Sequence, residues 1–241
     1  MSNRIDPREI DVEDVKYDSN GNRIYVVKDL DGSDSGDYVS VTSKLGETVP
    51  KGEGFYRWLG NADSYEDTQK YMKQRGEVGT KVHELCEKIA SQGARVVDEL
   101  KPLEDEVWKK ADSFQNFIED KEPEVIDTEF VVFCKEFNYA GRVDLLVEID
   151  GERVLIDLKT SKNIYDSHRL QLMLYRYGLE EGGVDIDKCA VLLLKDTGYK
   201  FVEVDYYPEL VRAQNVFYEW LDGGDPSRFE EPRIVEVEDD G

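Results

Sequence analysis

The sequence predicts an α/β fold in which a central mixed β-sheet is flanked by helices. Two segments with helical spacing of apolar residues come first, and three strand-like segments, another helix and two further strands follow. The turn signal Asp150-Gly151 joins two of these strands as an antiparallel hairpin. Hydrophobic residues make up 39% of the 241-residue chain and no break in composition separates two parts, so we expect a single folded domain over residues 1–241.

The N-terminal segment contains one strand-like run, at residues 23–27, and then a cluster of turn formers at residues 29–37. This cluster resembles a calcium-binding EF-hand loop only superficially. Asp34 stands where that loop needs glycine, and Ser40 stands where it needs glutamate. An acidic surface turn is the better interpretation.

Hydrophobic periodicity and turn signals place the remaining elements in order. Long helices are expected over residues 64–91 and 103–120, strands over 128–134, 139–149 and 153–160, a helix over 167–179, strands over 190–195 and 200–207, and a last helix over 208–221. An acidic tail covers residues 229–241.

The charge is strongly negative, with 31 basic and 54 acidic residues and a formal net charge of −23. General electrostatics would therefore repel nucleic acid. Three interpretations stay open: a solvated acidic surface, which would suit a salty cytoplasm such as that of a halophilic host, an acidic mimic of nucleic acid, or an acidic metal site.

We expect a cytoplasmic protein without a membrane segment. No apolar run approaches the roughly 20 residues that span a bilayer, and the first residues lack the apolar stretch of a secretory signal. Cys86, Cys134 and Cys189 are odd in number and widely spaced, which fits neither a disulfide framework nor a metal knuckle. We interpret them as reduced thiols in the core.

The segment VLIDLKTSK carries the first chemical signal. Side chains alternate along a strand, so Asp157 and Lys159 share one face while Ile156 and Leu158 point to the other. On the preceding strand Asp144 lies among apolar neighbours, where an unpaired charge is costly. If the hairpin pairs the two strands, Asp144 and Asp157 lie side by side, and two facing carboxylates repel each other unless a cation lies between them.

This combination suits phosphodiester hydrolysis. The reaction needs a hydroxide near neutral pH and stabilisation of negative charge, both of which carboxylate-held Mg²⁺ or Mn²⁺ supplies. A lysine can orient or deprotonate the water or steady the phosphoryl charge. The alternative is structural: Asp157 and Lys159, or Lys159 and Asp144, form a salt bridge on a strand face, and the short motif alone favours this alternative.

Segments distant in sequence add to the signal. GRVDLL, VLIDLKTSK and QLMLY follow one another, RGEVGTKVHELCEKI precedes them, and YVSVTSKLG stands further upstream. Together they resemble the G-T-x-x-H, G-x-x-D, D-x-K and Q-x-x-x-Y pattern of the PD-(D/E)XK nuclease superfamily, RecB-like exonuclease branch, as found in phages and archaeal viruses. The resemblance spans roughly residues 38–177 and implies a restriction-endonuclease-like core.

The resemblance implies a division of the domain and a set of roles. A helical part would cover about 50–122, the catalytic core about 125–206, and a C-terminal helix with the acidic tail 207–241. The metal ligands would be His83, Asp144, Asp157 and the backbone carbonyl of Leu158, with Lys159 as the catalytic lysine. An imidazole ligand favours Mn²⁺ alongside Mg²⁺. Glu129 is either a further acidic member of the site or an exposed strand residue.

Further residues would meet DNA. Gln171 and Tyr175 share a helix face and would either contact the DNA backbone or position the site near the lysine; alternatively Tyr175 packs and Gln171 is solvated. Phosphate contacts are expected from Arg142, Thr160, Ser161 and Lys162. His168 is interpreted as an exposed histidine.

The leading hypothesis is a Mg²⁺- or Mn²⁺-dependent deoxyribonuclease. By analogy with the family it would be an exonuclease that acts on linear ends of single- or double-stranded DNA, with replication, repair or recombination proteins as partners. The cysteine spacing does not match an iron-sulfur cluster, and we expect none. The alternative, favoured by the net charge alone, is a non-catalytic DNA-binding protein or an acidic partner of a recombination complex on the same fold.

Overall fold

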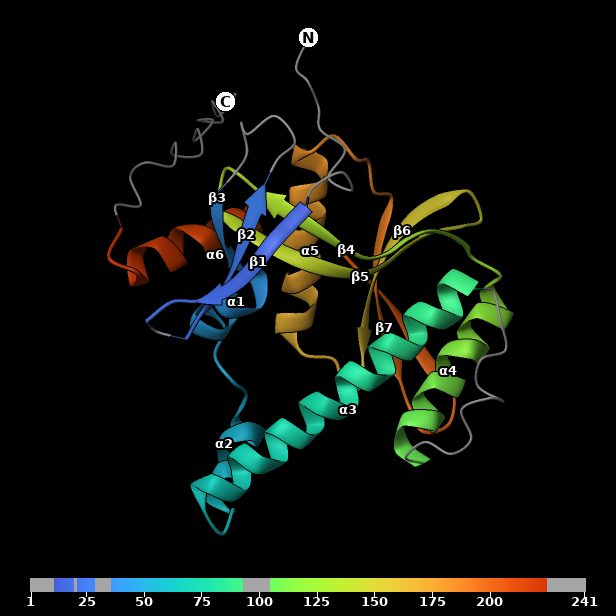
Figure 1. Ribbon diagram of the computed structural model, residues 1–241, viewed down its shortest axis with the longest axis horizontal. Coiled ribbons are helices and arrows are strands. Elements are labelled where there is room, and N and C mark those ends of the chain that lie inside the picture. The colour runs from blue at the N-terminus through green and yellow to red at the C-terminus, as the bar shows by residue number, and fades with distance from the viewer. Residues whose placement is uncertain (1–10, 20, 29–35, 93–104, 225–241) are drawn as a thin grey trace, which may run out of the picture.

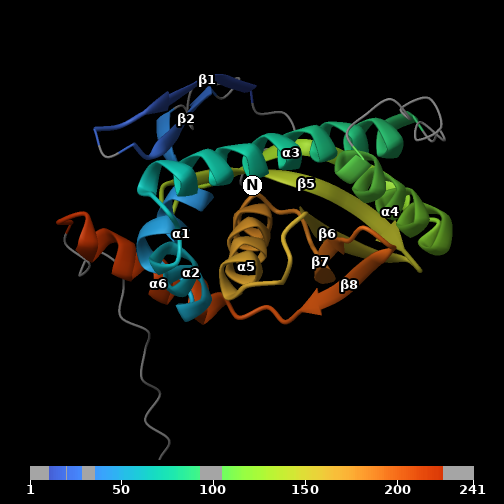
Figure 2. The same cartoon turned by 90° about the horizontal axis from the view of Figure 1, so that it is seen from below.

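A mixed sheet of eight strands forms the centre of the protein, and helices cover both of its faces (Figure 1, Figure 2). The computed structural model describes residues 11–19, 21–28, 36–92 and 105–224. The predicted fold class is therefore confirmed. None of the described helices combines the length and the apolar character that crossing a bilayer requires.

The strands are β1 (Asp11–Tyr17), β2 (Arg23–Lys28), β3 (Gly36–Ser40), β4 (Glu124–Cys134), β5 (Tyr139–Ile149), β6 (Glu152–Lys159), β7 (Lys188–Leu194) and β8 (Tyr199–Val204). The helices are α1 (Val41–Thr48), α2 (Glu53–Gly60), α3 (Tyr65–Gln92), α4 (Asp105–Lys121), α5 (Asp166–Glu181) and α6 (Pro208–Leu221).

The sheet forks at β5. One edge of β5 pairs antiparallel with β4 along almost its whole length. The other edge is shared, because β3 pairs in parallel with Tyr139 and Ala140 whereas β6 pairs antiparallel from Leu145 onward. Among the described strands, none pairs with residues 141–144 on that second edge. The branch β1–β2–β3 and the branch β6–β7–β8 diverge from this point (Figure 1).

The hairpin between β5 and β6 has the predicted turn. Asp150 and Gly151 have φ angles of 54° and 82°, as a two-residue type I′ turn requires. Ile149 therefore pairs with Glu152, and the ladder ends with Leu145 opposite Ile156. The next position on each strand is an aspartate, so the register brings Asp144 and Asp157 next to each other at the fork.

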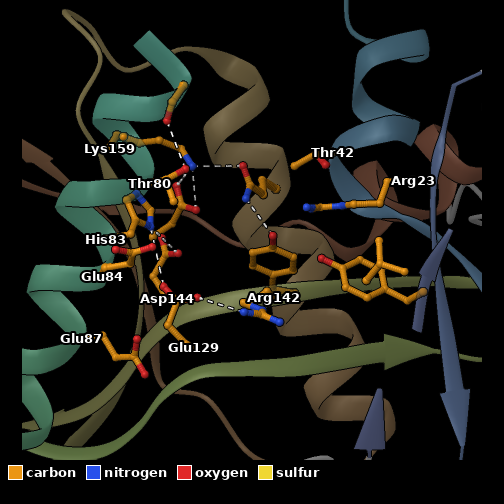
Figure 3. A pocket seen from close by; sticks show the side chains of 17 residues that line it. Arg23, Thr42, Thr80, His83, Glu84, Glu87, Glu129, Arg142, Asp144 and Lys159 are labelled. Atoms are coloured by element: carbon orange, nitrogen blue, oxygen red, sulfur yellow. Dashed lines mark hydrogen bonds and ion pairs between the residues drawn. The ribbon is translucent and has the colours of Figure 1, made fainter. Parts of the chain in front are cut away.

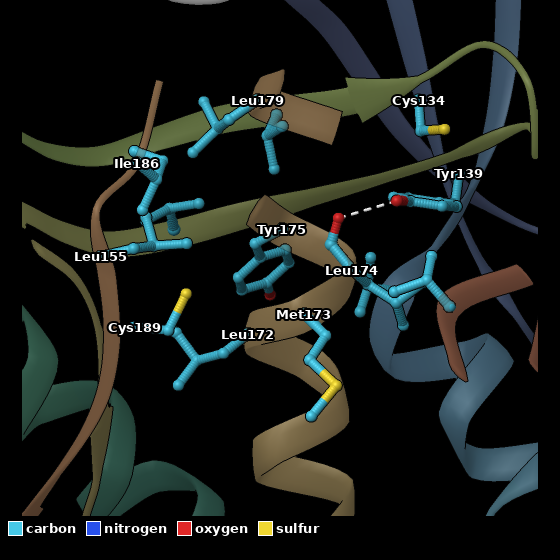
Figure 4. Close-up of a cluster of buried hydrophobic side chains, with 14 of the residues drawn as sticks. Cys134, Tyr139, Leu155, Leu172, Met173, Leu174, Tyr175, Leu179, Ile186 and Cys189 are labelled. Carbon is cyan, nitrogen blue, oxygen red and sulfur yellow. Dashed lines mark hydrogen bonds between the residues drawn. The ribbon is translucent and has the colours of Figure 1, made fainter. Parts of the chain in front are cut away.

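Two apolar cores lie on opposite faces of the sheet. Helices α3 and α4 bury one face with residues such as Ile89, Phe114 and Phe117. Helices α1, α5 and α6 bury the other face with residues such as Leu45, Leu174 and Val211, and part of this second core is drawn in Figure 4. The three cysteines are free and buried in these cores, Cys86 in the first and Cys134 and Cys189 in the second, which confirms their interpretation as core thiols.

The expected helices α3, α4, α5 and α6 lie within two residues of their predicted bounds. Two strand ends were wrong: β4 begins four residues earlier, at Glu124, because it continues to pair with β5, and β8 ends at Val204. The short elements β1, β3, α1 and α2 were not predicted, since none has enough residues to show a clear period. Of the turn cluster expected at 29–37, residues 29–35 lie outside the described residues, and Gly36 and Asp37 belong to β3 instead of a turn. The tail at 229–241 also lies outside the described residues.

Helix α5 packs tightly into the fork. The ring of Tyr175 is 3% exposed and lies over Gly141, where a Cβ would stand only 2.4 Å from Tyr175 Cε1. A side chain at position 141 would therefore force the ring or the backbone to shift. Glycine at position 141 thus allows α5 to approach the sheet at the point where the strands separate.

We expect Gly141→Ala to lower the free energy of unfolding by about 1–3 kcal/mol, because the added methyl group overpacks against the buried ring. Urea denaturation measures the change. The matched control is Gly46→Ala in α1, where nothing lies within 4 Å of an added Cβ and a gain of about 0.5–1 kcal/mol is expected from the better helix former. Equal stabilities of Gly141→Ala and wild type would contradict the close packing of Tyr175.

Candidate metal centre and active site

Three potential ligands from three different elements converge at the fork. They are His83 of α3, Glu129 of β4 and Asp144 of β5, and one ligand atom from each lies within 4.8 Å of the other two. His83 Nδ1 is 3.1 Å from Asp144 Oδ1 and 3.8 Å from Glu129 Oε1. Figure 3 shows the three side chains pointing toward one another from α3 and the sheet. Two carboxylates and an imidazole are ligands that Mn²⁺ and Mg²⁺ sites in proteins use.

Local structure fixes these side chains. Val82, Cys86 and Ile89 bury one face of α3 against the sheet, and His83 lies beside that face. On β4, Thr128 pairs with Leu145 and Phe130 pairs with Val143, so Glu129 stands opposite Asp144.

Glu129 has a φ of 50°. A residue with a Cβ in this left-handed region costs about 1–2 kcal/mol. Asp150 adopts this region in a turn, but Glu129 does so inside strand β4, and strain of this kind clusters at functional sites. Of the two interpretations offered for Glu129, membership of the acidic cluster fits its position.

Asp144 is held from two sides. Its Oδ1 faces the His83 imidazole, and its Oδ2 accepts a hydrogen bond of 2.6 Å from the backbone N–H of Leu158. This N–H lies just beyond the last pair of the β5–β6 ladder, so the aspartate side chain replaces the missing strand partner. The carboxylate is thereby fixed in position without a metal.

Asp157 and Lys159 form a second polar cluster, which lines the same pocket as the ligand cluster. Lys159 Nζ donates to Asp157 Oδ1 at 2.8 Å and lies 2.7 Å from Oδ2, although Oδ2 receives no well-aligned hydrogen bond. The same amine donates to Gln171 Oε1 at 3.3 Å, and Gln171 Nε2 donates to the Tyr175 hydroxyl at 2.8 Å. A continuous polar chain therefore runs from buried Tyr175 through Gln171 and Lys159 to Asp157.

The site attracts positive charge. Burial lowers the pKa of His83, but the hydrogen bond and the charge of Asp144 outweigh burial and raise that pKa to about 10. Burial alone would raise the pKa of Asp144, but the contact with His83 lowers it below its usual range. Burial, the main cause, and repulsion by Asp144 raise the pKa of Asp157 to about 6, against the opposing effect of Lys159.

These pKa shifts describe a position where a cation belongs. Near neutral pH a proton on His83 neutralises part of the charge of Asp144 and Glu129. A divalent ion at the same position would replace this proton, because an imidazole must be neutral to act as a ligand. The residues present thus fit a divalent metal ion. The ligand cluster contains Glu129 and does not include Asp157, which was expected as a ligand. The carboxylate of Asp157 instead pairs with Lys159.

The other predicted site residues surround this centre. Arg142 is half exposed, and its Nη1 lies 3.9 Å from Oε2 of Glu129. Thr160, Ser161 and Lys162 follow the end of β6, where Thr160 Oγ1 lies near Gly79 of α3 and Ser161 donates to the carbonyl of Asn163.

The interpretation of His168 as an exposed residue was wrong. His168 is half-buried, and its Nδ1 accepts a hydrogen bond from the N–H of Tyr165 at the start of α5. Burial, helped by the charges of Lys159 and Lys51, lowers the pKa of His168 to about 4. It caps the helix as a neutral ring.

A pocket of about 550 Å³ opens over the cluster and contains residues that the sequence did not single out. On α3 these are Thr80, Glu84 and Glu87, which lie on the same helix face as His83, so helical periodicity would have found them. From the N-terminal part of the chain come Val15, Arg23, Tyr25 and Thr42. No sequence signal links this part to the aspartates.

Arg23 stands on the wall of the pocket that faces the acidic cluster (Figure 3). Its guanidinium lies over the Tyr25 ring, 5.1 Å from the centroid, and its buried Nε has no hydrogen-bond partner. Among the described residues no carboxylate pairs with it. Its place on the pocket wall makes Arg23 a candidate for contact with an anionic ligand.

Comparison with known proteins adds the following. Residues 55–203 match the model of the PD-(D/E)XK nuclease superfamily. A solved structure described as the crystal structure of SSO0001 is similar at 14% identity and a TM-score of 0.31, over 61% of this chain and 77% of that one. No curated protein matches at a significant level. His83, Asp144 and Lys159 fall inside the matched span, and Arg23 and Thr42 precede it.

We expect the affinity for Mn²⁺ to rise with pH. A proton on His83 competes with the metal while the pH is below about 10, so the apparent affinity should increase by up to about tenfold between about pH 7 and about pH 8. Calorimetric titration measures this change. His83→Gln should bind Mn²⁺ more weakly and lose most of the pH dependence. A wild-type affinity that does not change with pH would contradict the role of His83 as a ligand.

Proposed function

We propose that this chain, which belongs to the PD-(D/E)XK nuclease superfamily, is a divalent-metal-dependent deoxyribonuclease that hydrolyses phosphodiester bonds. The observation that carries the proposal is the convergence of His83, Glu129 and Asp144 beside the Asp157–Lys159 pair. These residues come from α3, β4, β5 and β6, and a salt bridge within one strand would not need such a convergence.

His83, Asp144 and Glu129 would hold the ion, with Asp157 and the carbonyl of Leu158 as further candidates. The ion would supply a hydroxide near neutral pH and neutralise charge on the phosphoryl oxygens. The imidazole favours Mn²⁺ over Mg²⁺ as the better-bound of the two ions.

Lys159 would act on the nucleophile or on the phosphate. Its amine is mostly buried, at 18% exposure of the side chain, and shares hydrogen bonds with Asp157 and Gln171. These contacts orient it toward the pocket. An ammonium group there can orient the attacking water and steady the negative charge of the phosphoryl group.

We propose that Gln171 and Tyr175 position Lys159. Tyr175 is 3% exposed and Gln171 9% exposed, which leaves little surface for contact with DNA. Their hydrogen bonds instead lead to the lysine amine. Arg142, Thr160, Ser161 and Lys162, which border the centre, are the better candidates for contacts with phosphate, and Arg23 joins them.

More narrowly, we propose an exonuclease of the RecB-like branch, of the phage or archaeal-virus type, that works on linear DNA ends in replication, repair or recombination. The motif order along residues 38–177 supports this branch. The whole chain would act as one nuclease domain, because both branches of the sheet line the same pocket. The proposed location of this nuclease is the cytoplasm.

The nuclease activity is tested by digesting linear and circular DNA with Mn²⁺ or Mg²⁺. We expect loss of linear DNA and no cutting of circles. Lys159→Ala should reduce the rate by about 100-fold or more, the usual contribution of such a group. The matched control is Lys188→Ala, a lysine paired with Glu152 at the surface, which should keep full activity.

Undiminished activity of Lys159→Ala would falsify the assignment of the lysine. Inactivity of the wild type with every divalent ion would favour the non-catalytic alternative, for which the net charge of −23 is the supporting observation.

Arg23 provides a test of DNA binding. Because its guanidinium lacks an anionic partner, Arg23→Met should raise KM for DNA several-fold with little change in kcat, and the loss of one phosphate contact should flatten the salt dependence of binding by about 0.7–0.9 in log–log slope. Arg153→Met, an exposed arginine near the β5–β6 turn, is the control. The same KM for both variants and for wild type would exclude a phosphate contact at Arg23.

A further inference from the structure

Residues 51–75 form an arm that extends past the sheet. It consists of α2 and the first part of α3 (Figure 1). No residue of α2 is buried. The helix is held by its aromatic rings, since Trp58 lies 5.6 Å from Tyr71 and 5.7 Å from Phe55, measured between ring centroids. Helix α2 therefore adds little to the core.

The arm differs from the rest of the chain in composition. It contains five basic and four acidic residues, a net charge of +1 in a chain of −23, and five aromatic residues. Lys51, Lys70 and Lys73 are exposed, and they form no ion pair with any residue in the described ranges. Tyr56 and Tyr65 have exposed fractions of 58% and 70%. The arm thus offers both positive charge and exposed rings on which bases can stack.

The arm is continuous with the pocket. Gly76, Gly79 and His83 line the pocket from one face of α3. The same face continues one, two and three turns further back with Lys73, Gln69 and Tyr65, all of them exposed. At 1.5 Å per residue, Tyr65 lies about 27 Å from His83 along the helix. A strand bound at the acidic cluster and leaving along α3 would pass Lys73 and then reach Tyr65.

We propose that the α2–α3 arm binds a single strand of the DNA substrate, with the lysines on its phosphates and Tyr65 and Tyr56 stacked on its bases. This inference rests on the proposed function and specifies the form of its substrate. Base stacking on aromatic rings combined with a cationic track is the usual way to hold single strands without sequence preference. The net charge of the chain is −23, so a polyanion would be accepted where cations without an acidic partner lie next to the pocket, as they do along the arm and at Arg23.

Binding of a labelled oligonucleotide of about 20 nucleotides tests the arm, since even at ~3.4 Å per nucleotide it exceeds the length of the arm. The Lys159→Ala background with Mn²⁺ keeps the strand uncut. We expect Tyr65→Ala and Tyr56→Ala each to weaken binding about fivefold or more. Replacing Lys51, Lys70 and Lys73 by Gln should flatten the log–log salt slope by about 2.

Trp220→Ala is the matched control. Trp220 is 61% exposed and stacks on Phe217 at the surface of α6, so it is an aromatic residue of similar exposure away from the arm. The Trp220→Ala variant should bind the single strand as tightly as the wild type does. All six positions changed in these variants are at the surface, so equal melting temperatures will show that folding is unaffected.

Two results would overturn the proposal. In the first, the tyrosine variants bind the oligonucleotide as well as the wild type does, which would point to an acidic protein as the occupant of the arm. In the second, they lose affinity for a blunt duplex, whose bases are covered, as much as for the single strand. Because binding is measured without cleavage, these results are independent of whether the wild type hydrolyses DNA.

Discussion

The contact between Asp144 and His83 at the fork of the sheet is the interaction on which the site depends. The sheet offers residues 141–144 of β5 no strand partner on one edge among the described strands, and the carboxylate of Asp144 fills that gap by accepting the N–H of Leu158. The negative charge is thus fixed at a break in the ladder. The carboxylate of Glu129 lies close to that of Asp144, and the repulsion between the two is relieved only when a positive group is present. The imidazole supplies that group as a protonated ring, and a divalent ion would supply it more strongly.

The net charge of −23 sets the conditions under which the protein meets its substrate. Long-range repulsion from phosphate falls off beyond about 8–10 Å at physiological salt, so local cations decide where a strand is accepted. Many basic groups in the described chain pair with nearby carboxylates, as Lys188 does with Glu152 and Arg75 with Glu106. Arg23 and the exposed lysines of the arm are among those that do not. Of the three interpretations of the charge that the composition left open, the solvated acidic surface agrees with this distribution, and the acidic metal site agrees with the cluster at the fork.

Sequence reasoning predicted most of the helices and the central hairpin, because long periodic segments and the Asp150-Gly151 turn are strong local signals. It placed Asp144 beside Asp157 for the same reason. It could not find the N-terminal wall of the pocket, since the parallel pairing of β3 with β5 joins segments about 100 residues apart through only two residue pairs. The burial of His168 and the position of Glu129 at a left-handed φ likewise depend on tertiary contacts. No periodicity reports such contacts.

The fork also gives the two walls of the pocket unequal attachment. The branch with β6 joins β5 through five residue pairs and a tight turn, whereas the branch with β3 joins it through two parallel pairs. The ladder is not the only attachment of the second branch, because Tyr25, Val27 and Tyr38 pack against Phe133 and Ala140. Arg23 belongs to that branch, whereas Asp157 and Lys159 belong to the other. The spacing between Arg23 and Lys159 across the pocket is thus set by the burial of aromatic rings as well as by backbone hydrogen bonds.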